Sequence, residues 1–250
     1  LVNSGTVTFN NLIITNGNLA GAGTLVGGGI RNGGNLTIND SRIDSNSLFS
    51  TNFGAFGGGI SNAAGAILII NNSTIMNNTA SAGGVGSSGG GGINNSGTLT
   101  LNNSTVTGNI ATTSGTAPNN NGGGIRNPTG GSMTLNNSTI VNNTAIGGTS
   151  RGGGITDGSG SFSTISNTIL ANNTASSSFD CNGAIESMTN TLLESTIGCS
   201  GFVGPSNITG VDPNLGPLEA NGGVQNLYLP LHFFRSNPVQ YWAREITVRA

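Results

Sequence analysis

Residues 90–109, GGGINNSGTLTLNNSTVTGN, decide the fold, because close copies of this stretch recur along the chain. In each copy a glycine block precedes an isoleucine, an alternating apolar pair follows, and an Asn-Asn-Ser-Thr segment leads to another β-branched residue. Self-similarity with a period of 30 to 33 residues is typical of a solenoid. The isoleucine after the glycines stands at Ile30, Ile60, Ile93, Ile125 and Ile155.

Alternation such as Leu99-Thr100-Leu101 indicates short strands with one apolar face, and no segment has a helical period. Such strands bury their apolar faces only when each coil stacks on its predecessor. The sequence therefore predicts an all-β fold, a right-handed, single-stranded parallel β-helix of about six coils with three short strands per coil; the handedness follows from the crossover rule. A second apolar column is expected at Ile14, Ile43, Ile75, Val106, Ile140 and Ile169.

Asparagine marks the expected corners, where it tolerates left-handed backbone and can form ladders from coil to coil. Between the second apolar column and the next glycine block the spacing varies from 15 to 19 residues, and we expect this edge to carry the loops and any binding surface. Three corner sets are expected: Asn32, Asn62, Asn95, Asn127 and Asp157; Asn46, Asn78, Asn109, Asn143 and Asn172; and Asn39/Asp40, Asn71/Asn72, Asn102/Asn103 and Asn136/Asn137.

Charge is scarce: 6% of residues are charged, lysine is missing, and the formal net charge is −2. This composition predicts no nucleic-acid partner, and without an apolar run of about 18 residues no membrane span is expected in the chain. We expect a monomer without cofactor or metal. Cys181 and Cys199 favour an extracellular disulfide, with two free thiols as the alternative, and zinc lacks further ligands nearby.

Three segments follow from composition: β-helix repeats over 1–175, a C-terminal β-helix end with the cysteine pair over 176–230, and an atypical tail over 231–250. The tail holds the single histidine, the single tryptophan and three of the seven arginines. Two hypotheses explain it, a frameshift near Leu231 or an amphipathic capping segment.

The pattern Gly-Gly-Gly-Ile, Leu-Thr-Leu-Asn-Asn-Ser-Thr-Ile and Asn-Asn-Thr-Ala resembles the repeats of bacterial polymorphic outer-membrane proteins and related pectin-lyase-like β-helix proteins, over about residues 2–175. Residues 180–223, with both cysteines and Asp212-Pro213-Asn214, look like the end of the choice-of-anchor Q domain of secreted bacterial proteins. The resemblance implies a secreted or cell-surface bacterial protein with a separate anchor and paired cysteines. The chain departs from that pattern after Gly223.

Catalysis on a β-helix scaffold requires clustered carboxylates and a basic residue. The nine acidic residues are scattered here, and the neighbours Asp40 and Asp44 occupy corner positions that asparagine fills elsewhere. We therefore expect a non-catalytic structural or adhesive passenger. The alternatives are a fragment of a carbohydrate-active, pectate-lyase-like enzyme, and a glycan- or ice-binding face on threonines such as Thr37, Thr100 and Thr134.

Four residues on the variable edge are candidate ligand contacts. Phe49, Phe53 and Phe56 fall in one expected loop and could stack on a surface glycan or meet a host or partner protein; alternatively they fold back over the next coil. Arg151 could bind an anion, or remain a solvated side chain.

Overall fold

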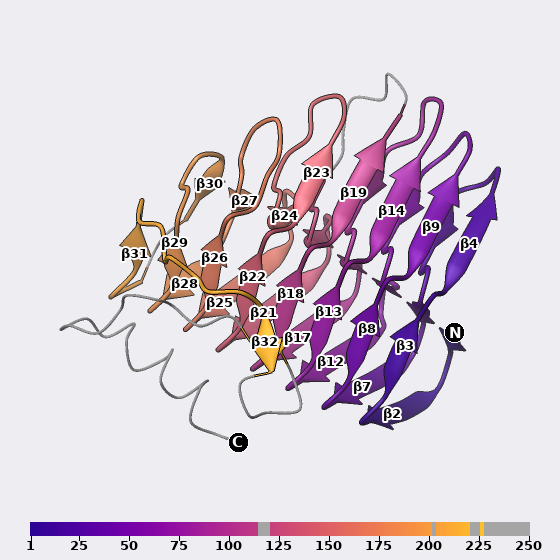
Figure 1. Ribbon diagram of the computed structural model, residues 1–250, viewed down its shortest axis with the longest axis horizontal. Coiled ribbons are helices and arrows are strands. Elements are labelled where there is room, and N and C mark those ends of the chain that lie inside the picture. The colour runs from indigo at the N-terminus through magenta and orange to yellow at the C-terminus, as the bar shows by residue number, and fades with distance from the viewer. Residues whose placement is uncertain (115–120, 202–203, 221–225, 228–250) are drawn as a thin grey trace.

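The computed structural model describes residues 1–114, 121–201, 204–220 and 226–227. Over these residues the protein is all-β, with no helix, and the chain winds into a stack of coils whose strands pair in parallel (Figure 1). The predicted fold class, a parallel β-helix, is confirmed. The tail at 231–250 and its two hypotheses lie outside the described residues.

Three parallel sheets run along the stack, and each coil except the last contributes one strand to each sheet; the last described coil adds strands to sheets A and C alone. Sheet A contains β1 (Val2–Asn3), β6 (Ile30–Asn32), β11 (Ile60–Asn62), β16 (Ile93–Asn95), β20 (Ile125–Asn127), β24 (Ile155–Asp157), β27 (Cys181–Ala184) and β30 (Cys199–Ser200). Sheet B contains β2 (Thr6–Asn10), β7 (Asn35–Asn39), β12 (Ile67–Asn71), β17 (Thr98–Asn102), β21 (Ser132–Asn136), β25 (Phe162–Ser166) and β28 (Ser187–Thr189). Sheet C contains β3 (Ile13–Thr15), β8 (Arg42–Asp44), β13 (Thr74–Met76), β18 (Thr105–Thr107), β22 (Thr139–Val141), β26 (Ile169–Ala171), β29 (Leu192–Leu193) and β31 (Ile208–Thr209).

The glycine-block isoleucines form a continuous column inside sheet A. Ile60 pairs with Ile30 on one side and Ile93 on the other, and the column continues through Ile125 to Ile155. All five side chains are fully buried in one core cluster that also includes the alternating pairs of sheet B. Like residues therefore lie over like along the axis, and apolar burial stabilises every coil against its neighbours.

The second column departs from the sequence expectation in one coil. Ile140 pairs with Leu170, so Leu170 is the buried member and the predicted Ile169 pairs with Thr139 on the outer face. The same one-residue shift affects the corner set, where Asn173 replaces the predicted Asn172. Both observed residues lie 30 positions after their partners Ile140 and Asn143, so the coil keeps its register. The prediction chose Ile169 and Asn172 because residues of the same type stand one position earlier, where the side chain points to the other face.

Sheet B keeps the same register in that coil but has a polar residue in its core column. Phe162 pairs with Ser132 and points outward, 61% exposed, while Ser163 takes the buried position that Met133 holds in the preceding coil. A hydroxyl in the core column requires polar partners, and Ser163 finds one in Asp157 at 2.9 Å.

The variable edge was predicted to carry loops. It also contains two further parallel sheets. Sheet D contains β4 (Asn18–Gly21), β9 (Ser47–Ser50), β14 (Thr79–Ala82), β19 (Ile110–Thr113) and β23 (Thr144–Ile146), and sheet E contains β5 (Leu25–Val26), β10 (Ala55–Phe56) and β15 (Ser88–Gly89). Small side chains such as Ala80 and Ala111 pair in register there. Stacking of the main sheets places these segments one strand apart, so they pair although their sequences have weak strand propensity.

The glycine block is required by close packing beneath sheet D. Its first glycine has a left-handed backbone, as at Gly90 with φ of 59°. Its second leaves no room for a side chain, since a Cβ at Gly91 would lie 2.5 Å from the carbonyl group of Ile110. The repeated Gly-Gly-Gly-Ile motif is thus a packing requirement of each coil.

The same sheets continue past residue 175 to β30, β28 and β31. Cys181 and Cys199 form a disulfide between neighbouring strands of sheet A, with their Cα atoms 5.4 Å apart. The chain then turns back across the outer face of sheet C, where Leu215 packs against Val141, Ala171 and Leu192 (Figure 1). A last antiparallel pair joins β32 (Glu219–Ala220) and β33 (Asn226–Leu227).

Candidate functional site: polar ladders and an apolar edge

A buried row of amides, here called ladder 1, follows the end of the sheet A strands. Each side-chain Nδ2 donates to the Oδ1 of the next coil at 2.7–2.8 Å. The members between the two ends are fully buried, so these hydrogen bonds form in a low-dielectric environment where losing one is costly. Ladder 1 runs Asn3, Asn32, Asn62, Asn95, Asn127 and Asp157.

A second buried row, ladder 2, lies at the corner between sheets C and D. Its amides also donate toward the C-terminal end, at 2.9–3.0 Å. Each Oδ1 accepts in addition the backbone N–H of the previous member, as between Asn109 and Asn143 at 3.1 Å. Each Nδ2 also reaches a carbonyl of an earlier coil, so these residues fasten backbone as well as side chains. Ladder 2 runs Asn46, Asn78, Asn109, Asn143, Asn173 and Asp180.

A third row, the outer ladder, lies on the solvent side of the corner between sheets B and C and has the opposite polarity. Its amides donate toward the N-terminal end at 2.8–3.0 Å. The residue after each member has positive φ, for example 49° at Asn103, as expected for a left-handed corner. The outer ladder comprises Asn10, Asn39, Asn71, Asn102 and Asn136.

Both buried ladders end in a carboxylate, which accepts hydrogen bonds and donates none. Burial raises the pKa of Asp157 from its usual value; hydrogen bonds from Ser161, Asn127 and Ser163 lower it, and the charge of Glu186 raises it. Burial likewise raises the pKa of Asp180 to about 6, against hydrogen bonds from Asn173 and Ser195. The spacing alone had marked Asp157 only as a corner residue.

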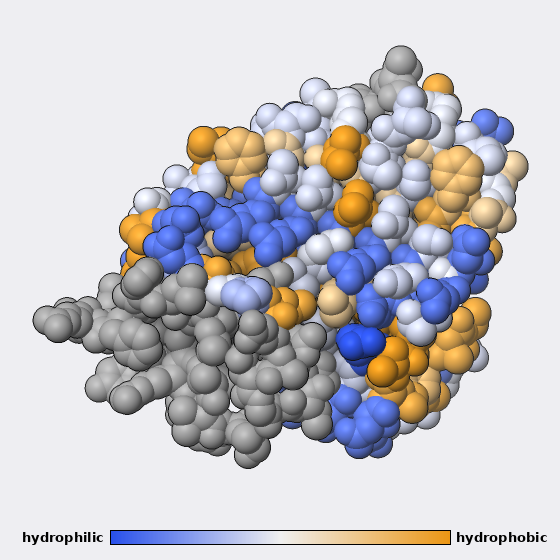
Figure 2. All heavy atoms as spheres, in the orientation of Figure 1, coloured by the Kyte–Doolittle hydropathy of each residue, from blue (hydrophilic) through white to orange (hydrophobic). Residues whose placement is uncertain are grey.

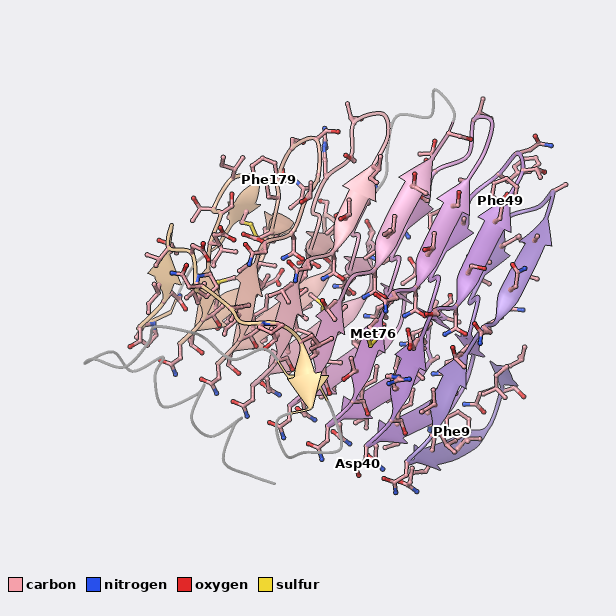
Figure 3. The ribbon with its side chains drawn as sticks, viewed as in Figure 1. Phe9, Asp40, Phe49, Met76 and Phe179 are labelled. Carbon is pink, nitrogen blue, oxygen red and sulfur yellow. A yellow bond between two sulfur atoms is a disulfide. The ribbon has the colours of Figure 1, made fainter. Side chains whose placement is uncertain are left out.

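Exposed apolar side chains collect on the edge formed by the connections from sheet C to sheet A. Among the described residues seven large ones lie there, from coils at both ends of the stack. Figure 2 shows apolar atoms spread along this upper edge, above a band of hydrophilic residues. Figure 3 shows Phe49 and Phe179 on that edge, with Asp40 on the opposite side. We call this set the apolar edge: Leu19, Phe49, Phe53, Val85, Ile146, Phe179 and Ile197.

The three candidate phenylalanines do not share one loop. Phe49 lies in β9 and is 43% exposed, Phe53 follows it in a turn and is 56% exposed, and Phe56 lies in β10. The guanidinium of Arg126 lies 4.7 Å from the centre of the Phe56 ring and donates to Asn94 at 2.8 Å. Burial lowers the pKa of Arg126 from its usual value. Phe49 and Phe53 thus present open surface, whereas Phe56 serves a cation–π contact.

Arg151 is exposed beside the strand ends of the same edge. Its backbone bridges to Asn121 and Ser177, and its carbonyl accepts a hydrogen bond from Thr156 at 3.1 Å. The exposed guanidinium lies on the row that continues sheet E rather than beside Phe49. The structure therefore does not assemble the four predicted contacts into one site.

A polar cavity of about 840 Å³ opens near the C-terminal end of ladder 2, lined among others by Phe179, Asp180, Glu194 and Asp212. Its carboxylates already accept backbone N–H groups: Glu194 from Asn172 at 2.6 Å, and Asp212 from Asn214 at 2.8 Å. These carboxylates therefore stabilise the turns of the last coils through side-chain to backbone hydrogen bonds.

The remaining sequence candidates occupy positions that the repeat itself explains. Asp44 lies 3.3 Å from Arg42, and Asp40 has positive φ in the corner column that asparagine otherwise fills. Thr37, Thr100 and Thr134 share one outer column of sheet B, which Ile69 interrupts. The described residues contain no group of three His, Cys, Asp or Glu side chains placed to hold a metal, and no helix there is long and apolar enough to span a membrane.

Architecture and ladders together define the class: the protein is a parallel β-solenoid stabilised by polar ladders on two buried corners. Comparison of the chain with protein-family models, with curated proteins and with solved structures finds no match.

Proposed function

We propose that the protein is a non-catalytic, surface-exposed β-helix that acts as a rigid adhesive segment and contacts a partner protein through the apolar edge. The apolar edge carries this proposal, because exposed apolar side chains recur along it on most of the coils, from Leu19 to Ile197, and exposed apolar groups gathered on one edge are a mark of protein interaction sites. Rigidity comes from the ladders, which fix each coil to the next.

The chemistry of the edge favours a protein over a glycan. Four of the seven residues of the apolar edge are aliphatic, and three of these, Val85, Ile146 and Ile197, are 50–78% exposed. Val85 and Ile146 lie on connections rich in glycine, serine and alanine. Sugar recognition depends on aromatic platforms with converging polar groups, whereas aliphatic patches suit apolar side chains of another protein. An extended edge also allows several weak contacts to act together.

Location on a bacterial cell surface, as a secreted protein of the polymorphic outer-membrane or choice-of-anchor type, is part of the same proposal. Its support is the repeat resemblance together with the disulfide between Cys181 and Cys199, which suits an oxidising compartment. Four of the nine acidic residues accept hydrogen bonds from backbone or ladder groups at the C-terminal ends of the buried ladders, which supports a structural rather than a catalytic role for them. They are Asp157, Asp180, Glu186 and Glu194.

The test is binding of the purified chain to a panel of extracellular matrix and plasma proteins by biosensor, with a glycan array in parallel. The variant Phe49→Ser/Val85→Ser/Ile146→Ser should lose at least about tenfold in affinity for any protein bound, as expected for removing apolar contacts. The matched control, Ile67→Ser/Phe162→Ser, removes exposed apolar groups from sheet B and should bind normally.

Equal loss in both variants, or binding confined to the glycan array, would contradict the assignment of the apolar edge to a protein partner. Protease shaving of intact cells tests the location, since a surface protein should be released as fragments while an internal one stays intact.

A further inference from the structure

The C-terminal end of ladder 1 leaves a buried carboxylate oxygen without a partner. Asp157 is 4% exposed, and its Oδ2 atom has no hydrogen-bond partner. In the preceding coils the equivalent residue is asparagine, whose amide group donates onward to the next coil. Asp157 faces Gly183 in the next coil, a residue without a side chain, so the row of amides stops here.

All the hydrogen bonds that Asp157 accepts through its side chain end on its other oxygen, Oδ1. Oδ1 accepts from Asn127 at 2.7 Å, from Ser161 at 2.6 Å and from Ser163 at 2.9 Å. The Ser161 hydroxyl also contacts the carbonyl oxygen of Gly158 and has one proton to give. The acceptor oxygens of Asp157 and Gly158 therefore outnumber the N–H and O–H protons that can reach them. Leaving the buried Oδ2 atom unpaired costs free energy.

A second carboxylate lies nearby, on Glu186, which is exposed to solvent. Glu186 lies over Ser163 in the next coil, and its Oε2 accepts the Ser163 backbone N–H at 2.5 Å. The groups that act electrostatically on Asp157 are hydroxyls, an amide and this carboxylate, all of them neutral or negative. A positive charge beside the Oδ2 atom of Asp157 would therefore stabilise this region, whereas another acceptor would not.

We propose that Asp157 and Glu186 provide the carboxylates of a structural site for a hard divalent cation of the Ca²⁺ type, completed by nearby hydroxyl and carbonyl oxygens. An all-oxygen donor set with two carboxylates suits Ca²⁺, which accepts irregular geometry, better than Mg²⁺ or softer metals. The cation would fasten β24, β25 and β28 where ladder 1 ends. This inference is independent of the proposed adhesive function.

The experiment measures Ca²⁺ binding to the EDTA-treated chain by titration calorimetry, and thermal unfolding with and without Ca²⁺. We expect one site with a Kd of about 10⁻⁴–10⁻³ M, as in extracellular calcium modules. The Tm should rise by about 3 °C at roughly tenfold excess over Kd. Mg²⁺ at equal concentration should give a smaller shift.

Three isosteric variants each remove one negative charge. Asp157→Asn restores the amide found in the preceding coils, so it should fold and lose the Ca²⁺-dependent shift. Asp40→Asn places asparagine where other coils already have it, far from the site, and should keep the full shift. Glu186→Gln should weaken binding at least about tenfold, because one carboxylate is lost.

Absence of Ca²⁺ binding to the unaltered chain at about 10 mM would overturn the proposal, since an extracellular site of this class would then be filled. Retention of the shift in Asp157→Asn would overturn it equally, because Ca²⁺ would then bind elsewhere.

Discussion

Removing one amide from ladder 2 should destabilise the protein far more than removing one from the outer ladder. Asn109 is fully buried; its Nδ2 donates to Asn143 and to the carbonyls of Ile75 and Thr107, and its Oδ1 accepts the backbone and side-chain N–H groups of Asn78. Asn109→Ala leaves two buried donors and the carbonyl oxygen of Ile75 short of partners. At about 1–3 kcal/mol for each group left unsatisfied, we expect a loss of roughly 4 kcal/mol.

The matched control is Asn102→Ala in the half-buried outer ladder, where water can replace the lost hydrogen bonds. We expect a loss of about 1 kcal/mol there. Equilibrium denaturant unfolding followed by circular dichroism measures both variants against the unaltered chain. Losses of similar size in the two variants would refute the reasoning that burial makes the ladder amides decisive.

Three further predictions concern packing, cross-linking and pH. Gly91→Ala should cost about 3 kcal/mol because its Cβ meets backbone, whereas Gly23→Ala, with open space around it, should be nearly neutral; unfolding midpoints of the two variants decide this. Replacing both cysteines by alanine should lower the free energy of unfolding by about 3 kcal/mol, because the disulfide closes a loop of 18 residues and so restricts the unfolded chain. An unchanged denaturant midpoint would contradict this. Because burial raises the folded-state pKa of Asp180 to about 6, its protonation favours folding: the contribution is full below about 3.8 and is lost as pH rises through 6. The Tm difference between the unaltered chain and Asp180→Asn should therefore change between pH 4 and 7.5. The change corresponds to at most about 3 kcal/mol in the free energy of unfolding. A difference that stays constant with pH would contradict the raised pKa of Asp180.

Identical side chains made the main columns predictable. Where isoleucine or asparagine recurs at the repeat period, as at Ile93 or Asn95, the sequence alone indicated the correct column and its burial. The coil containing Phe162 was misassigned because Ser163 occupies a core position and because Ile169, which precedes Leu170, is also aliphatic; the offset to the preceding coil stays at 30 residues. The pairing of neighbouring strands shows that Leu170 rather than Ile169 points inward.

The edge sheets and the ends of the ladders were beyond sequence reasoning for different physical reasons. The strand Thr79–Ala82 alternates small side chains alone, with Ala80 and Ala82 buried, and it forms because stacked coils bring the backbones together. The polarity of a ladder depends on which way each amide group faces, and a sequence does not encode this locally. A signal for the ladder ends did exist: Asp157 and Asp180 are acidic residues in a chain with few charges.

In-register stacking of successive coils is the central claim, and distances between spin labels along one column test it most directly. Thr8, Thr134 and Thr164 lie in one outer column of sheet B, with Thr134 four strands and Thr164 five strands from Thr8. At about 4.8 Å per strand, labels at positions 8 and 134 should lie about 19 Å apart, and labels at 8 and 164 about 24 Å apart. Pulsed electron paramagnetic resonance that shows this increment of one strand supports the parallel stack; equal distances, or broad distributions beyond about 30 Å, would contradict it.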